Sequence, residues 1–302
     1  MEKLGELDSL KITVLAEDSV LYGSPYVGQH GISLLLEAAS RGNIRRILVD
    51  VGQNSEALIS NMINMSICPS IVNAVVLTHC HYDHSHGIVR VLREIGRTDI
   101  PVIAHPGIFH LHFRTEPYYM PVGITPADSK EEIEKAGGSL SLTKDPFVIM
   151  PGMITTGEVK RQTKFEEVGT TTLKTIENGM VVDDKVLDDI SVIACIKDKG
   201  LVIVTGCSHA GIINIAKQAM AITDCNKVEG IIGGLHLVKA PDTRIKRTVE
   251  ELTNLNVAWI SVGHCTGFKA QVELYLAFAE RFSPLHTGMQ FELVSNDRRL
   301  VL

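Results

Sequence analysis

Residues 75–87 read VVLTHCHYDHSHG, and four histidines and one aspartate follow directly after an apolar, β-branched run. Such a run is typical of a buried strand, so the polar side chains stand where that strand ends. His79 and His81 are two residues apart, and in extended backbone their imidazoles leave the chain on the same side. Asp83 and His84 follow where the chain turns into a helix. The stretch therefore predicts one metal site at the first pair and a second beside it.

A histidine-rich surface loop is the alternative interpretation of this stretch. We disfavour it because four ligand-type side chains at these offsets, directly after a buried strand, rarely arise by chance. Cys80, Ser85 and His86 are weaker candidates in the same stretch. His86 is expected on the outer surface of the following helix.

The composition is that of an ordinary globular protein with a slight excess of acidic over basic residues. The chain has 302 residues and 45% hydrophobic side chains, and 29 Lys and Arg against 35 Asp and Glu leave a formal net charge of -6. This balance argues against a broad electrostatic hold on nucleic acid or on an anionic membrane. Any phosphate ligand is therefore expected to be small and to be bound locally.

Targeting signals and cysteine usage indicate a cytoplasmic protein. The N-terminus, MEKLGELDSLKITVL, has acidic residues where a signal peptide needs a basic region, and no later segment approaches an apolar membrane span. The six cysteines form no CxxC pair, so reduced thiols are expected. Two of them, Cys207 and Cys265, stand beside histidines and are candidates for chemistry.

Strand-like and helix-like segments alternate along the chain, which predicts the α/β class. Apolar, β-branched runs predict strands at 11–17, 45–52, 73–79, 100–105, 190–196, 200–206, 228–234 and 257–263. Apolar residues at three- and four-residue spacing predict helices near 55–65, 86–96, 210–220, 244–255 and 269–282.

The stretch from about 110 to 188 breaks this alternation, because it holds short polar segments and few long apolar runs. We interpret the chain as a single domain over residues 1–302 with an insertion at about 110–188 near the active site. A plain surface excursion is the alternative for that stretch.

At the HxHxDH pattern of His79, His81, Asp83 and His84, the chain resembles the metallo-β-lactamase superfamily. The segment RRILVDVG resembles the early strand whose terminal aspartate, here Asp50, supports the ligands from behind. The segment VAWISVGHCTG resembles the last ligand strand, which implies His264 on the second metal. The resemblance implies an αββα sandwich of two mixed β-sheets packed face to face, with helices outside and two divalent ions at one edge.

The chain departs from the superfamily pattern at two positions. The strand GLVIVTGCSH resembles the one that delivers a metal-bridging aspartate, but Cys207 stands in that place. The histidine expected before that strand is missing, and His209 is the nearest candidate, with Asp188 and Asp189 as a fallback. Cys207 is either a soft bridging ligand or a packing residue. The implied sets are His79, His81 and His209 on one ion and Asp83, His84 and His264 on the other.

A subgroup resemblance rests on four further segments: GQHGISLLLE (28–37), TGCSHAGI (205–212), GGLHL (233–237) and GHCTG (263–267). The subgroup occurs in methanogens and various anaerobes. Its named activity joins a dihydropterin-methyl diphosphate to ribofuranosylaminobenzene 5'-phosphate in methanopterin biosynthesis, and other members are described as metal-dependent hydrolases.

Residues that could contact a phosphorylated substrate lie in the same segments. Small residues begin the helices after Cys207 and His264, where free N–H groups favour an anion, and tight packing is the alternative reason for them. The candidates there are Ser208, Thr266 and Gly267, with His30 in GQHG as a weaker one. In the basic cluster Lys239, Arg244, Lys246 and Arg247, Lys239 or Arg244 could reach a second phosphate.

His236 and Asp83 are the catalytic candidates. His236 ends another strand at the same sheet edge, and in related branches of the superfamily a histidine between the last two ligands is the general acid. A hydrogen-bonded structural histidine is the alternative for His236.

Three functions remain open from sequence. The first is a metal-dependent transferase acting on a small phosphate or diphosphate ester, and the second is a phosphodiesterase-like hydrolase that uses a metal-bridging hydroxide. The third is a metal-binding module without turnover. Zinc is the first choice for the two ions, with manganese, iron, nickel or magnesium as alternatives. Sequence makes no prediction of the oligomeric state.

Overall fold

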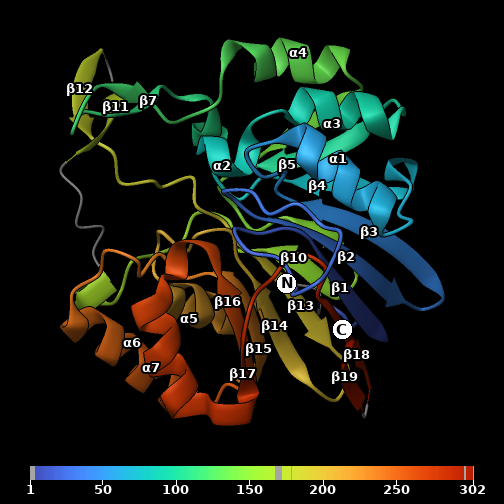
Figure 1. Cartoon of the computed structure of the whole chain (residues 1–302), viewed down its shortest axis with the longest axis vertical. Helices are drawn as coiled ribbons and strands as arrows, with labels where there is room; N and C mark the ends of the chain where they lie inside the picture. The colour runs from blue at the N-terminus through green and yellow to red at the C-terminus, as the bar shows by residue number, and fades with distance from the viewer. Residues whose placement is uncertain (1–3, 167–171, 178, 296, 302) are drawn as a thin grey trace.

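Two β-sheets face each other at the centre of the molecule in a computed structural model that describes residues 4–166, 172–177, 179–295 and 297–301 (Figure 1). The first sheet has eight strands in the order β19-β18-β1-β2-β3-β4-β5-β8. Their bounds are β1 Ser9–Ala16, β2 Ser33–Ser40, β3 Asn43–Val49, β4 Ala74–Val76, β5 Ile100–Ala104, β8 Gly138–Leu142, β18 Gln290–Val294 and β19 Asp297–Val301. Strands β3, β4, β5 and β8 are parallel and the others antiparallel, so the sheet is mixed.

The second sheet has seven strands in the order β17-β16-β15-β14-β13-β10-β9 and is also mixed. Their bounds are β9 Val148–Met150, β10 Met153–Thr155, β13 Val192–Ile196, β14 Gly200–Val204, β15 Val228–Gly234, β16 Trp259–Gly263 and β17 Phe282–Pro284. The parallel strands β14, β15 and β16 end at the same edge, which is where the loops after them meet.

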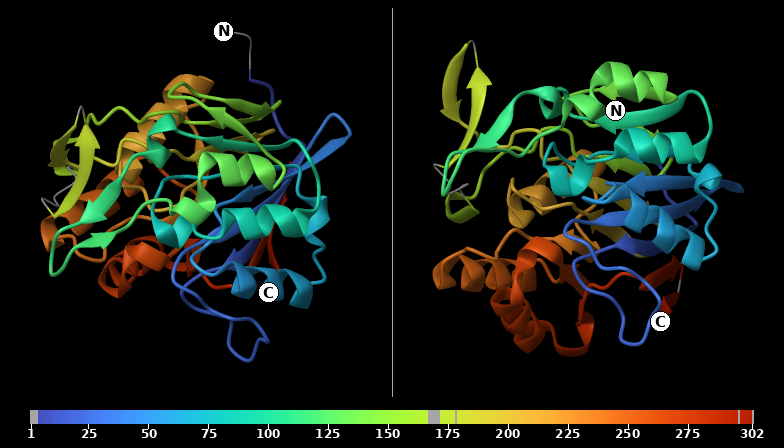
Figure 2. Two further views of the ribbon diagram at one scale, coloured as in Figure 1. Left: turned by 90° about the horizontal axis from the view of Figure 1, so that it is seen from above. Right: turned by 45° about the horizontal axis from the view of Figure 1, so that its top comes forward.

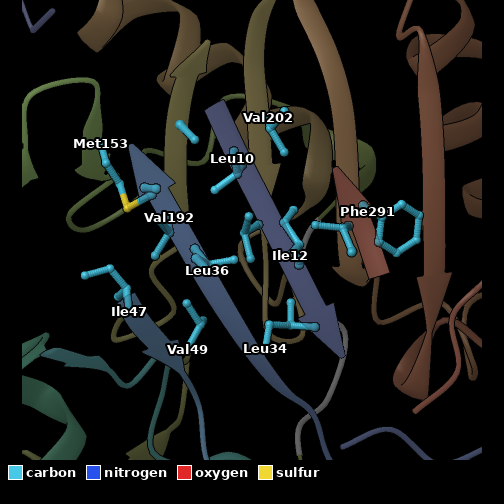
Figure 3. Packing of buried hydrophobic residues seen from close by; sticks show 14 of the residues in the cluster. Leu10, Ile12, Leu34, Leu36, Ile47, Val49, Met153, Val192, Val202 and Phe291 are labelled. Carbon is cyan, nitrogen blue, oxygen red and sulfur yellow. The ribbon is translucent and has the colours of Figure 1, made fainter. Parts of the chain in front are cut away.

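The central strands are buried on both faces, which explains their continuous apolar runs. In β14, Val202 and Val204 point into the core between the sheets, whereas Leu201 and Ile203 pack under the outer helices. Figure 3 shows the inner core, where Leu10 and Ile12 lie among side chains of both sheets. Side chains that alternate in this way lock the register, because a one-residue slip would reverse both faces.

Helices cover the outer face of each sheet, which completes the αββα sandwich (Figure 1). On the first sheet lie α1 Ser55–Asn64, α3 Ile88–Ile95 and α4 Lys130–Lys135, and on the second lie α5 Ile212–Thr223, α6 Asp242–Asn254 and α7 Phe268–Phe278. The short helix α2 Tyr82–Ser85 lies in the loop after β4. Single 3₁₀ turns are η1 Pro69–Ile71, η2 Pro106–Phe109, η3 Pro126–Asp128, η4 Lys164–Glu166, η5 His264–Thr266 and η6 Ala279–Arg281. Within the described ranges, no helix has the length and apolar character needed to span a membrane.

The range predicted as an insertion, 110–188, is divided among three sheets. It supplies β8 to the edge of the first sheet and β9 and β10 to the edge of the second. Besides α4, η3 and η4, the range contains a separate four-stranded sheet in the order β12-β11-β6-β7, with bounds β6 His112–Arg114, β7 Met120–Pro121, β11 Leu173–Glu177 and β12 Met180–Asp183. Figure 2 shows this small sheet projecting at one side of the molecule.

The predicted fold class is confirmed, and each predicted strand and helix has a counterpart in the structure. Helix prediction at 86–96 was slightly long, because Gly87 takes φ 82° and α3 begins only at Ile88. The sequence interpretation missed the central strand β2. In the two main sheets it also missed the short strands β8, β9, β10, β17, β18 and β19, which have three to five residues each and therefore carry little periodicity.

Candidate active site

Four chain segments bring the predicted ligands together at the edge between the two sheets. His79 and His81 follow β4, and Asp83 and His84 lie in α2. The other residues come from the second sheet: Cys207 and His209 follow β14, His236 follows β15 and His264 follows β16.

The three residues predicted for the first metal lie in mutual contact. His79 Nε2 is 3.1 Å from His81 Nδ1, and the ring of His209 lies 4.8 Å, centre to centre, from each of the other two rings. Ligand atoms of His79, Cys207 and His209 lie within 4.8 Å of one another. The arrangement is compact enough to enclose one ion.

The residues predicted for the second metal form a neighbouring group with Cys207. Ligand atoms of Asp83, His84, Cys207 and His264 all lie within 4.8 Å of one another. Asp83 Oδ2 is 3.2 Å from His264 Nε2, and Cys207 Sγ is 3.1 Å from His84 Nε2. The Cys207 thiol belongs to both groups, so it stands where a bridging ligand would stand.

The donor atoms of this cluster fit divalent metal ions. Both ring nitrogens of His209 and Nε2 of His81 are buried without a hydrogen-bond partner among the described residues. Burial and the neighbouring imidazoles hold the pKa of His209 well below its usual range, and burial lowers the pKa of His81. Neutral imidazoles with unshared lone pairs are the form that binds a metal.

Asp83 is held as a carboxylate. Burial alone would raise its pKa, but the imidazoles of His84 and His264 lower the pKa of Asp83 well below its usual range. An ionised oxygen among imidazoles and a thiol suits zinc and other transition ions better than magnesium, which prefers an all-oxygen environment.

Asp50 supports the ligand loop from behind, as the sequence resemblance implies. Its carboxylate accepts hydrogen bonds from the Thr78 amide (2.7 Å) and the Thr78 hydroxyl (2.7 Å) and lies 2.7 Å from His84 Nδ1. Gly206 packs against this network, since a Cβ there would lie 2.1 Å from Thr78 Oγ1. The carboxylate therefore orients His84 so that Nε2 faces the metal position.

Asp18 is a residue of the candidate site that the sequence interpretation missed. Asp18 Oδ1 is 2.9 Å from His264 Nδ1, and Oδ2 is 3.1 Å from His30 Nδ1. His30 Nε2 in turn lies 3.4 Å from Asp83 Oδ2. Glu17 accepts a hydrogen bond from the His264 amide. The available signal was an acidic pair directly after the first strand, but nothing local links it to a histidine 246 residues away.

Asp188 and Asp189, the fallback ligands, lie behind the site. Asp188 Oδ2 accepts the Cys80 amide (2.8 Å), and Asp189 Oδ2 accepts the Ala210 amide (2.8 Å). Each carboxylate thus braces a loop that carries ligands. Burial raises the pKa of Asp189 to about 7.

In the structure, the residues predicted as phosphate contacts in the two loops make contacts within the protein instead. The Ser208 hydroxyl donates to the Gly234 carbonyl (2.7 Å), and Thr266 Oγ1 accepts the Leu235 amide (3.1 Å). Gly267 takes φ 77° and packs against the backbone of Val238. None of these three residues lines the cavity described below.

The backbone amides in the first turn of α5 already bind a carboxylate of the same chain. The Glu166 carboxylate accepts the Ile213 and Asn214 amides, each at 2.9 Å. Gly211 has no room for a side chain because a Cβ would lie 2.4 Å from Glu166 Cδ. The small residues after Cys207 are therefore explained by packing, which was the alternative interpretation, and a phosphate has no access to these N–H groups.

The ligand cluster opens into a cavity of about 960 Å³. His236 lines it, with its ring 4.1 Å from that of His209 and with Nδ1 unpartnered among the described residues. His30 and Lys239 line the cavity as well. His86, in contrast, is exposed on the outside, as predicted.

The sequence is similar to known proteins over most of its length. A family model described as a beta-lactamase superfamily domain matches residues 45–160. The chain is 43% identical over 287 residues to the 7,8-dihydropterin-6-methyl-4-(beta-D-ribofuranosyl)-aminobenzene-5'-phosphate synthase of Methanocaldococcus jannaschii, which covers 94% of this chain and 97% of that protein. It is also 34% identical over 249 residues to an uncharacterised protein of the same organism, with 82% of this chain and 88% of that protein covered.

Solved structures agree with the observed fold. Tm1679, described as a metal-dependent hydrolase of the beta-lactamase superfamily, superposes with a TM-score of 0.78 at 24% identity over 94% of this chain and 99% of that chain. The metallo-beta-lactamase fold protein YhfI from Bacillus subtilis gives 0.55 at 15% identity over 95% and 100%. At this identity the structural matches speak for the fold alone. With 43% identity over 94% of its length to a synthase, the chain is an enzyme of the metallo-β-lactamase superfamily and belongs to the family of that synthase.

Proposed function

We propose that this enzyme is a metal-dependent transferase that joins a dihydropterin-methyl diphosphate to an arylamine carrying a ribofuranosyl 5'-phosphate. The observation that carries the proposal is the cluster of imidazoles, Asp83 and Cys207 at the end of a cavity of about 960 Å³. The cavity lies at the upper end of the ordinary size range of small-molecule sites, which favours a reaction of two substrates over hydrolysis of one. The name of the 43% identical relative supports the same chemistry.

Two ions would be held by the sets described above, with Cys207 between them, and we propose zinc because imidazole and thiolate donors suit it. When bound, these ions supply positive charge that stabilises the leaving diphosphate.

The residues of the chain supply positioning and proton transfer. The new bond joins the pterin methyl carbon to the arylamine nitrogen while the bond from that carbon to the diphosphate breaks. The nitrogen then loses a proton, and the imidazole of His236, which lines the cavity, is the acceptor that we propose. Asp18 contacts the imidazoles of both His30 and His264 and holds them beside Asp83.

We propose a small phosphorylated metabolite as the partner, because the net charge of -6 disfavours polyanions at long range. The cytoplasmic location remains a prediction from the sequence.

The test is an assay of metal-loaded protein with dihydropterin-methyl diphosphate, with and without the arylamine. A transferase releases diphosphate only when the arylamine is present and forms one conjugate per diphosphate released. Release of diphosphate without the arylamine would instead identify the phosphodiesterase-like hydrolase. Protein stripped of metal by a chelator is the control, and His86→Ala, which changes an exposed histidine of the same loop, should match the wild type.

A further inference from the structure

The cavity lining carries charges of both signs. Its only carboxylates among the described lining residues, Asp18 and Asp83, lie beside the ligand histidines. Four cations line the same cavity: Arg114, Lys239, Arg244 and Arg247. They come from two separate parts of the fold, the small four-stranded sheet and the segment from β15 into α6.

Arg114 projects into the cavity from β6 without a carboxylate partner in the part of the chain that the structure describes. Its guanidinium contacts the Met120 sulfur (3.4 Å) and lies 5.3 Å from the centre of the Tyr118 ring. Its Nε is buried and makes no hydrogen bond to a described residue. A half-buried guanidinium held only by a thioether and an aromatic ring has donors left for a ligand.

Lys239 is the second cation without an ion-pair partner among the described residues. The neighbouring Arg247 differs, because Glu250 (2.9 Å) and Glu251 (2.6 Å) neutralise it. Lys269, close by in sequence to His264, is likewise paired with Asp242. Arg244 has the Glu166 carboxylate nearby. Among the described residues, Arg114 and Lys239 are therefore the lining cations for which no compensating carboxylate is found.

The same cavity has apolar side chains in its lining. They are Tyr82, Val122, Phe165, Leu173 and Val238. A ligand that matches this lining has a flat apolar part and an anionic group for the cations.

We propose that Arg114 and Lys239 form a subsite for the phosphate monoester of the second substrate, with its aromatic ring against the apolar lining. The inference rests on the proposed function and adds where the second substrate lies. The diphosphate of the first substrate binds with the ions, so different groups of the protein neutralise the two anionic groups. In this arrangement the arylamine nitrogen, at the other end of the ring from the sugar phosphate, faces His236.

The test measures binding by calorimetry, independently of turnover, with three probes on metal-loaded protein: ribose 5-phosphate, ribose and inorganic diphosphate. Wild type is expected to bind ribose 5-phosphate more tightly than ribose. Arg114→Met and Lys239→Met should each weaken ribose 5-phosphate about 10-fold and leave diphosphate unchanged, because each removes one charged contact to the monoester. Arg93→Met, an exposed arginine on α3, is the matched control.

The inference is overturned if ribose and ribose 5-phosphate bind equally to wild type, or if both variants lose affinity for diphosphate and not for ribose 5-phosphate. Lys239 is exposed, so its variant tests the inference even if Arg114→Met does not fold. Normal ribose 5-phosphate binding without any conjugate formed in the assay above would instead reject the proposed function and leave the subsite standing.

Discussion

The two halves of the ligand cluster are built in different ways. The loop after β4 delivers His79, His81, Asp83 and His84 within six consecutive residues, most of them in one short turn and α2. The second sheet delivers Cys207, His209, His236 and His264 one or two at a time, from the ends of three parallel strands. The first half is local in sequence, whereas the second half exists only when the strands are aligned.

Backbone strain follows the same division. In the second half, Ser208, His236 and His264 take positive φ values of 59°, 48° and 48° in the loops that follow their strands. Each such residue costs on the order of 1 kcal/mol or more unless the surroundings hold it. Close packing holds them here, since a Cβ at Gly234 would lie 2.5 Å from the Gly206 carbonyl oxygen. Tertiary packing thus positions the strand ends of the second half. In the first half the spacing of the ligands is set within one turn, and Asp50 and Asp188 brace that turn.

The largest expected effect comes from the removal of one ligand from either half. His81→Ala and His264→Ala should each lower metal content and reduce turnover by about 10³-fold or more, because each removes a donor from one ion. Elemental analysis and steady-state kinetics check this, with the exposed His86→Ala as control. Wild-type metal content in both variants would contradict the assignment. Loss of both ions in His264→Ala alone would show that the second half governs the first.

The next prediction distinguishes a role in proton transfer from a role in metal binding for a residue of the second half. His236→Ala should keep metal content and thermal stability but lower kcat by roughly 10²- to 10⁴-fold, since only a proton-transfer group is removed. The control is His110→Ala, which lies outside the cavity lining. If the His236 variant loses metal instead, His236 is a ligand and His209 becomes the weaker candidate.

A smaller effect concerns the residue that joins the halves. Cys207→Ala should weaken metal binding by about 10- to 100-fold, a change typical of losing one supporting contact. In cobalt-loaded protein the sulfur-to-metal charge-transfer band should disappear with it, and should persist in Cys68→Ala, whose thiol is exposed. A band that persists in Cys207→Ala and is lost in Cys265→Ala would move the thiolate ligand to Cys265.

The smallest effect concerns His112, which is linked to the first half through Val122. The Val122 amide donates to the His112 carbonyl, and the Val122 carbonyl accepts the Tyr82 amide. Burial alone would lower the pKa of His112, but the Asp184 carboxylate (2.6 Å) and nearby Asp188 raise that pKa to about 9. A raised histidine pKa contributes stability that is fully present below about pH 6.5 and is lost as the pH rises through about 9, here roughly 3 kcal/mol. Urea unfolding of wild type and His112→Gln across this range measures it, with His110→Gln as control. Parallel pH profiles of wild type and His112→Gln would refute the expectation.

Much of the fold and one half of the site could be predicted because their signals are local. The alternation of β-branched runs with helical periodicity identifies the strands and helices, and the spacing of His79, His81, Asp83 and His84 carries its own geometry. The family resemblance extended this to His264 and to Asp50. The same reasoning placed a phosphate at the start of α5, where the Glu166 carboxylate stands.

By itself, the sequence determined the layered α/β fold and a metal-binding loop after a buried strand, because periodicity and turn geometry act over a few residues. Only the tertiary structure decided which distant groups complete the site. Asp18 meets His264 across 246 residues, and Arg114 reaches the cavity from a small sheet that has no periodic signal of its own. Which distant residues meet depends on which strand ends share an edge of the sheet. The packing of the whole core fixes that arrangement.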